Sequence, residues 1–367
     1  MASDSFTALL TPLIGRLTRT MVRVDCSLQE GSKIQARDRA ARAVMAVTAL
    51  VLIILSASCS SLVKSKDYTI PKLLTPLTDA KFDDLVKQLQ PFTDVQSIRT
   101  SQAYMLFTDA AASEKYRFEA ELTLILQRPD KIRMLIQASF GTKIADMVSE
   151  SNHFKVSIHN PTEYRQFLIG TNDADYSEWL AKLNGKEKES ALSSARPYHF
   201  TEALMMRPIL LNDPRFVFGL EEALVEEADT RPAAKRGARI LRSFYVISEL
   251  EASPEGQGPA RVRRRFWFDR TNGARFARQQ IFDQQGQLAT EVLYSDYKNI
   301  SSGGQSGNGP AWPSVILVNR PHEGYMARLT FNGEKFEIDP ELKPAAFTLE
   351  NTEKYREIDL DNPEKRP

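Results

Sequence analysis

The sequence contains few of the residues on which metal and redox chemistry depend. It has 2 cysteines and 4 histidines among 367 residues. Two cysteines cannot make a disulfide framework, and four histidines are sparse for a metal site. It also lacks an excess of charge of one sign, because 48 basic residues balance 47 acidic ones and leave a net charge of +1. A near-neutral chain gives no support for nucleic-acid binding, which leaves a basic footprint. We therefore expect no metal, no cofactor and no nucleic-acid partner.

Motifs of catalysis are also lacking. The sequence has no Gly-rich phosphate loop, no G-x-S-x-G elbow and no H-E-x-x-H pair of zinc ligands. His153 and His159 would lie roughly 20 Å apart along one strand, too far to share a metal ion. The basic run Arg261–Arg265 has the spacing of a solvated strand face, and the alternative is contact with anionic lipid headgroups or an acidic partner. With 42% apolar and 26% charged residues, the chain has the composition of an ordinary globular protein, and we expect it not to be an enzyme.

A charge-free run near the amino end, from Ala43 to Val63, follows a group of arginines that ends at Arg42. Basic residues, an apolar core and a small-residue cut site are typical of a signal peptide. The run contains Ser56-Ala57-Ser58-Cys59, which is similar to a bacterial lipobox. We expect residues 1–58 to be a signal peptide with an over-long start, and Cys59 to be lipidated. The alternative is a transmembrane anchor, since a span needs roughly 20 apolar residues.

After Cys59 the sequence predicts a lipidated tether over 59–76, one domain over 77–350 and a polar tail over 351–367. The clearest element is Tyr116–Gln127, in which apolar and polar residues alternate as in a half-buried antiparallel strand. A helix is expected over 82–89. Two further helices are expected between Gly, Pro and Asn residues that end them. Further strands are expected at 131–138, 143–150, 153–158, 164–170, 215–225, 240–251, 261–269, 275–283, 288–297, 315–319, 326–331 and 335–338, with the two further helices at 175–183 and 198–206.

This element list predicts a mainly β fold with a few helices. Strands and helices do not alternate in the way that a parallel sheet requires. A sheet of about a dozen strands must curl or split to hide its faces. We therefore expect a strongly curved antiparallel sheet, an incomplete and open β-barrel, covered by helices. Its interior could pack solid or hold a ligand.

Two sets of residues are candidates for function. Ser139 and Gly141 flank Phe140 between two regular strands, and this pattern predicts that Phe140 stands exposed at the tip of a turn, where it contacts the membrane. The alternating face of the early strand and the apolar face of a later helix are expected to line one shared apolar space. The expected lining residues are Phe118, Leu122, Leu124, Leu204 and Met205.

Four segments, taken in chain order after the lipobox, carry a family resemblance: Tyr116–Gln127, Leu135–Thr142, Arg196–Leu204 and Pro310–Leu317. In this order the chain resembles the LolA/LolB superfamily of periplasmic lipoprotein-localisation factors, and most closely the LolB-like outer-membrane lipoproteins. The resemblance implies an open barrel whose helices form a lid over a cavity for acyl chains. It also implies that Phe140 stands where the family has a leucine on a protruding loop that helps to hand lipoproteins to the membrane.

Two classes of function follow from these observations. The first is a non-enzymatic outer-membrane lipoprotein that binds acyl chains or lipoproteins and helps to localise them. Its partners would be those acyl chains, the membrane surface through lipidated Cys59, and a periplasmic carrier protein. The second is a structural or regulatory lipoprotein of the same fold with a packed core and a protein partner. The sequence does not separate them, because an alternating strand looks the same over a cavity and over a core.

Overall fold

The computed structural model of the chain describes residues 71–109, 117–174, 176, 196–229, 231–253, 258–302 and 311–362. These residues fall in one compact unit, Pro71–Pro367, and the other unit, Met1–Ile70, lies outside the described part. The signal peptide, Cys59, most of the tether and nearly all of the helix expected at 175–183 are therefore outside the described residues. Among the described residues, no helix has the length and apolar character to cross a membrane.

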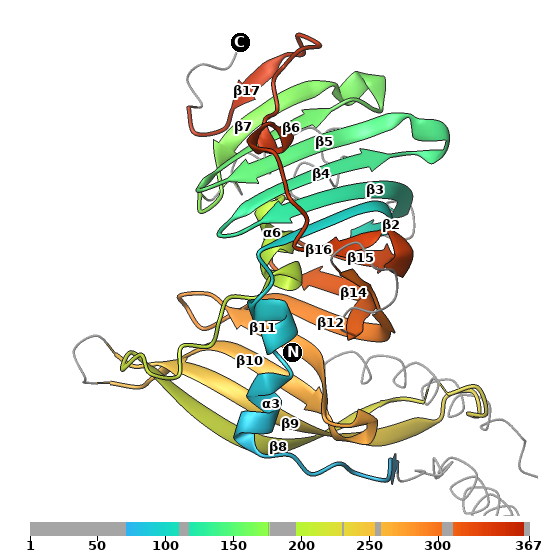
Figure 1. Ribbon diagram of the computed structural model, residues 1–367, viewed down its shortest axis with the longest axis vertical. Helices are drawn as coiled ribbons and strands as arrows, with labels where there is room; N and C mark the ends of the chain where they lie inside the picture. Colours follow the sequence, from blue (N-terminus) through green and yellow to red (C-terminus); the bar gives the residue numbers. More distant parts are fainter. Residues whose placement is uncertain are drawn as a thin grey trace, which may run out of the picture. The chain divides into compact units, whose positions relative to one another are not determined.

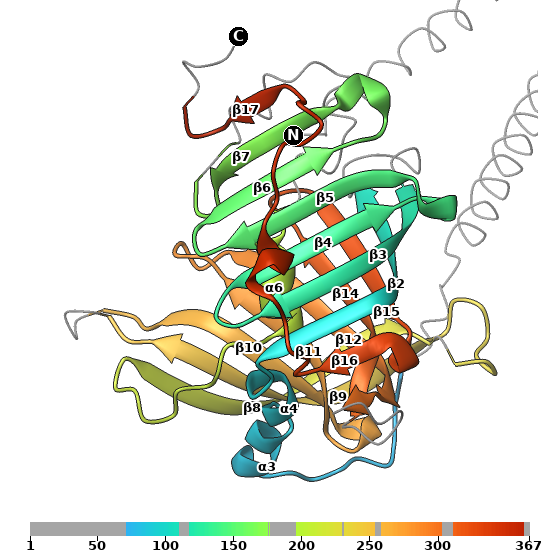
Figure 2. The ribbon, with the colours of Figure 1, turned by 45° about the horizontal axis from the view of Figure 1, so that its top comes forward.

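One large β-sheet organises the unit Pro71–Pro367 (Figure 1). The strands from β2 to β7 follow one another in chain order (Figure 2), and the chain then moves to the opposite edge and returns. From one edge to the other, the sheet consists of β8 (Phe216–Ala228), β9 (Arg239–Glu251), β10 (Arg261–Asp269), β11 (Arg275–Phe282), β12 (Leu288–Asn299), β14 (Ala311–Arg320), β15 (Tyr325–Phe331), β2 (Ser97–Asp109), β3 (Arg117–Gln127), β4 (Lys131–Gln137), β5 (Lys143–Glu150), β6 (His153–Ile158), β7 (Gln166–Thr171) and β17 (Glu357–Asp359).

The sheet is open at both edges. Within the described part of the chain, β8 pairs only with β9 and β17 pairs only with β7, so no ladder joins the two ends into a closed barrel. The sheet is also mixed, because β17 lies parallel to β7 while the other long neighbours are antiparallel. Three short strands extend it: β1 (Lys72–Leu73) beside β9, β13 (Ser301–Ser302) beside β16, and β16 (Phe336–Ile338) beside β2.

Alternation of side chains builds the core on one face of the sheet. In β4, for example, Ile132, Met134 and Ile136 are buried, and their neighbours in the strand are only partly so. Inward-facing residues of β2 to β7 and of β9 to β15 join them in one apolar cluster. Burial of apolar area on this scale is the main driving force for folding.

The described helices are short: α3 (Phe82–Lys87), α4 (Gln90–Thr93) and α6 (Tyr198–Leu204). Helix α6 packs against β4 and β14, and most of its residues are buried in the core. The expected cover of helices over the sheet is not seen in the described residues; the helices instead contribute side chains to a filled interior.

Two segments expected to be irregular join the sheet instead. Lys72 and Leu73, in the expected tether, pair with Ile240 and Leu241 of β9. Residues Glu357–Asp359, in the expected polar tail, pair with β7. Both segments are too short for periodicity to reveal them, and neighbouring strands supply the hydrogen bonds that hold them.

Candidate functional site

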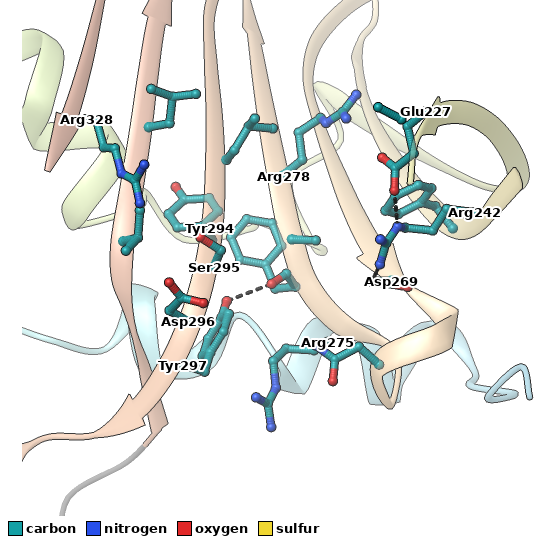
Figure 3. A pocket seen from close by; sticks show the side chains of 18 residues that line it. Glu227, Arg242, Asp269, Arg275, Arg278, Tyr294, Ser295, Asp296, Tyr297 and Arg328 are labelled. Atoms are coloured by element: carbon teal, nitrogen blue, oxygen red, sulfur yellow. Dashed lines mark hydrogen bonds and ion pairs between the residues drawn. The ribbon is translucent and has the colours of Figure 1, made fainter. Parts of the chain in front are cut away.

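The pocket in Figure 3 has a volume of about 1020 Å³ and lies across β8, β9, β11, β12, β14 and β15. It is on the face of the sheet opposite the core. In β14, the lining residues Val315 and Leu317 alternate with the core residues Ile316 and Val318. The lining residue Arg328 lies in the same way between two core residues of β15. The pocket is therefore separate from the interior that the sequence pointed to.

One cross-strand row of side chains gives the pocket its character. Residues directly opposite one another on neighbouring strands point to the same face of a sheet. Neighbouring strands lie about 4.8 Å apart. Arg278 and Arg328 are separated by three strand steps, so their backbones stand roughly 14 Å apart. Two leucines fill the positions between them. The row reads Trp267 (β10), Arg278 (β11), Leu293 (β12), Leu317 (β14) and Arg328 (β15).

Arg242 stands at one end of the pocket and is held by two carboxylates. Its guanidinium donates to Asp269 at 2.8 Å and also to Glu227. Burial would lower the pKa of Arg242, but the hydrogen bonds to these two carboxylates outweigh burial, and the pKa is raised. The backbone N–H of Thr271 fixes Asp269 by donating to it at 2.8 Å. Arg242 is therefore part of the wall, with its charge already compensated.

Arg278 is also occupied. Its guanidinium lies 5.1 Å from the ring centroid of Trp267 and 6.0 Å from that of Phe244. Its Nη1 is 3.6 Å from a carboxylate oxygen of Glu291. Cation–π contacts and this ion pair together hold the side chain over the aromatic part of the wall.

Arg275 and Arg328 are less constrained. The guanidinium of Arg275 lies over the ring of Tyr297 at 4.8 Å, and the Tyr297 hydroxyl donates to the carbonyl of Phe276 at 2.7 Å. Burial raises the pKa of Tyr297, so its hydroxyl keeps its proton at neutral pH. In the described part of the chain, neither arginine forms a hydrogen bond or ion pair with an acid. These two cations are free to meet a ligand.

The residues expected to line a cavity lie elsewhere. Leu122, Leu124, Leu204 and Met205 are at most 2% exposed in the core cluster. Phe118 is partly buried, packs on the same cluster and stacks on a core phenylalanine. All five belong to, or pack against, the same large apolar cluster, but none of them lines the pocket of Figure 3. Their contact with a ligand stays a prediction.

Phe140 lies in the 3-10 turn Ser139–Gly141, between β4 and β5, and its side chain is fully exposed. Its φ of 70° lies in the left-handed region, as does the φ of 77° at Gly141. The backbone N–H of Ala138 donates to Thr142 at 2.8 Å and closes the turn. The geometry leaves Phe140 free to touch a membrane, and that contact stays a prediction, as does lipidation of Cys59.

Sequence reasoning missed the pocket residues for a physical reason. In β15, Arg328 alternates with the apolar residues Ala327 and Leu329, which is the pattern of any solvated strand face. In β11, Arg275 and Arg278 are three residues apart and would point to opposite faces of a regular strand, but a register shift against β10 brings both to the pocket. Only the register between strands puts Leu293 and Leu317 between Arg278 and Arg328. Strand register across a sheet of this length depends on contacts that are distant in sequence.

Comparison with known proteins gives matches among solved structures only. No protein-family model matches the chain, and no curated protein matches it. A LolA superfamily protein of Nitrosomonas europaea aligns with 74% of this chain and 99% of its own, with 10% identity and a TM-score of 0.38. At this identity and TM-score the likeness does not assign the chain to a family.

Two further structures are similar to this chain. A DUF1329 family protein of Desulfovibrio piger covers 72% of this chain and 95% of its own, at 13% identity and a TM-score of 0.37. A Vibrio parahaemolyticus domain named for outer-membrane lipoprotein sorting covers 72% and 94%, at 11% identity and a TM-score of 0.34. Likenesses this distant do not identify a ligand, which has to be inferred from this chain's own residues.

Proposed function

We propose that this chain is a non-enzymatic lipoprotein of the bacterial outer membrane that binds acyl chains, free or as part of lipoproteins, and helps to localise them. The pocket of Figure 3 is the observation that carries the proposal. Leu293, Val315 and Leu317 give it an apolar wall, and Tyr297 extends that wall with an aromatic ring. Removing a methylene from water contributes about 0.8 kcal/mol, so an acyl chain laid along this wall would be held by its own hydrophobicity.

The position of β1 supports a membrane-bound function. Leu73 pairs with Leu241, which is next to Arg242 at one end of the pocket. Cys59 precedes Lys72 by only 13 residues, and an extended chain spans at most about 3.6 Å per residue. A lipid on Cys59 would therefore keep β1 within about 47 Å of a membrane. One acyl chain binds a membrane only marginally, whereas two hold a protein stably.

The test of lipidation is metabolic labelling with a clickable fatty acid in a Gram-negative host. We expect label on the full chain and none on Cys59→Ser, which should be unprocessed or released as a soluble protein. Equal labelling of both proteins would contradict the proposal.

The test of the pocket is a variant that places a bulky side chain beside its apolar wall. Ser295 is exposed on β12 and lines the pocket, so Ser295→Trp should block it without disturbing the core. Ser101→Trp, at an exposed position of β2 outside the pocket, is the matched control. Binding of a fluorescent C16 fatty acid should be lost in Ser295→Trp and kept in Ser101→Trp. Equal binding by both variants would exclude this pocket as the acyl site.

A second candidate function is favoured by the filled interior. Leu122, Leu124 and Leu204 are almost fully buried, as they would be in a structural or regulatory lipoprotein with a packed core and a protein partner. Native mass spectrometry of the purified protein separates the two functions. Co-purifying phospholipid or lipopeptide supports the acyl-binding protein. Absence of any bound lipid, together with failure to bind the fatty acid, would favour the protein-binding alternative.

A further inference from the structure

The charges of the pocket go beyond what an acyl chain requires. Its lining includes four arginines and three carboxylates, so its formal net charge is +1. The two carboxylates at one end compensate Arg242. Arg278 is engaged by Glu291 and by two aromatic rings. The charge available to a ligand therefore comes from Arg275 and Arg328.

These two arginines border the same apolar patch from opposite sides. Arg275 belongs to β11 and Arg328 to β15, and the strands between them, β12 and β14, carry the patch. Leu317 is the direct cross-strand neighbour of Arg328. Figure 3 shows Arg275 beside Tyr297 and Arg328 at another side of the pocket. An arginine has a long flexible stem with a charged end, so it can pack along the wall while its guanidinium meets a polar group at the mouth.

We propose that the pocket selects an amphiphile whose head carries a single negative charge, and that the positive charges of Arg275 and Arg328, on opposite borders of the patch, attract this head. The inference rests on the acyl-binding function proposed above and names the head group. Guanidinium groups form short, charge-assisted hydrogen bonds with phosphate and carboxylate oxygens. The third carboxylate of the lining, Asp296, makes no hydrogen bond or ion pair through its side chain in the described part of the chain. Its charge disfavours a dianionic head and favours a phosphodiester such as that of phosphatidylglycerol.

The experiment compares ligands that share one acyl chain. Lysophosphatidylglycerol, with a monoanionic phosphodiester, and a monoacylglycerol, with no charge, are titrated into the full-length protein by calorimetry. We expect lysophosphatidylglycerol to bind roughly tenfold more tightly, the factor expected for about one charge-assisted hydrogen bond. The preference should weaken as salt is raised, because salt screens exposed charges.

Variants assign the preference to residues. Arg328→Gln and Arg275→Gln should each reduce the ratio of the two affinities several-fold, and the double variant should abolish it. Arg356→Gln, which removes an exposed arginine outside the pocket, should leave the ratio unchanged. A ratio that the double variant does not alter would overturn the assignment.

The remaining outcomes distinguish a failure of the head-group inference from a failure of the proposed acyl-binding function. If both ligands bind equally well to the unmodified protein, the head-group inference fails and acyl binding stands. If neither ligand binds, the proposed acyl-binding function itself fails. If inorganic phosphate at millimolar concentration displaces lysophosphatidylglycerol, the arginines form a site for a small free anion and the lipid head group is overturned as its source.

Discussion

His199 of α6 and Tyr325 of β15 are joined inside the protein, where Nδ1 of the imidazole lies 2.7 Å from the tyrosine hydroxyl. The other ring nitrogen, Nε2, is buried without a hydrogen-bond partner in the described part of the chain. Its nearest carboxylate oxygen, on Glu323, is 3.9 Å away. Burial, followed by the charges of Arg320 and Arg196, lowers the pKa of His199 well below 6.5. A neutral imidazole therefore ties α6 to the sheet.

This contact predicts a loss of stability in acid. The unfolded chain protonates His199 near pH 6.5, and the native protein does so only at lower pH. Below about pH 6.5 the unfolded state therefore binds more protons, and stability falls by up to about 1.4 kcal/mol per pH unit. Urea unfolding at pH 7.5, 6.5 and 5.5 measures this. The stability difference between wild type and His199→Gln should shrink with acid. Parallel curves for His199→Gln would contradict the prediction.

Leu124 tests whether the interior is packed. It is completely buried in the core cluster, so Leu124→Ala should lower the free energy of unfolding by about 2–5 kcal/mol. The matched control is Leu224→Ala on β8, where the side chain is 62% exposed and the change should stay within about 0.5 kcal/mol. Urea denaturation measures both. A loss below about 1 kcal/mol for Leu124→Ala would indicate a loose, ligand-ready interior instead.

Arg264 and Glu249 form a buried ion pair. Replacing one partner alone should lower the free energy of unfolding more than replacing both. Arg264 donates to Glu249 at 2.6 Å and to the carbonyls of Arg207 and Pro208 at 2.8 and 3.1 Å. Glu249→Leu leaves the buried guanidinium without its counter-charge and should cost about 3–5 kcal/mol. The double variant Glu249→Leu with Arg264→Met should recover much of this loss. A double variant as unstable as the sum of the single variants would show that the pair is not coupled.

Phe140 tests membrane contact. It is exposed in its turn, so Phe140→Glu should leave the melting temperature unchanged. Burial of a phenylalanine in lipid contributes about 1.5–3 kcal/mol, enough to strengthen binding of a lipid-anchored protein without anchoring it alone. Liposome flotation of the Cys59-lipidated chain should weaken several-fold in Phe140→Glu and remain unchanged in Leu224→Glu. Early melting of Phe140→Glu would place the side chain in a packed contact and contradict the prediction.

Strand positions follow well from the sequence where alternation is regular. The strand expected at 143–150 is β5, and the strand expected at 261–269 is β10, with the same bounds. Strand β2 (Ser97–Asp109) is the main omission, although it lies between β3 and β15 in the middle of the sheet. Its register with β3 shifts between Thr100 and Ala103. A shift of this kind interrupts the two-residue period on which strand prediction depends.

The amino-acid sequence alone determined the β class, most strand positions and the exposed turn at Phe140, because periodicity and turn residues are local properties. The tertiary structure decided the rest. Whether Leu122 and Leu204 face a cavity or a packed core depends on how closely α6 approaches the sheet. The grouping of Arg275, Leu317 and Arg328 around one pocket depends on strand register. Both are set by contacts between residues far apart in the chain, which no local pattern records.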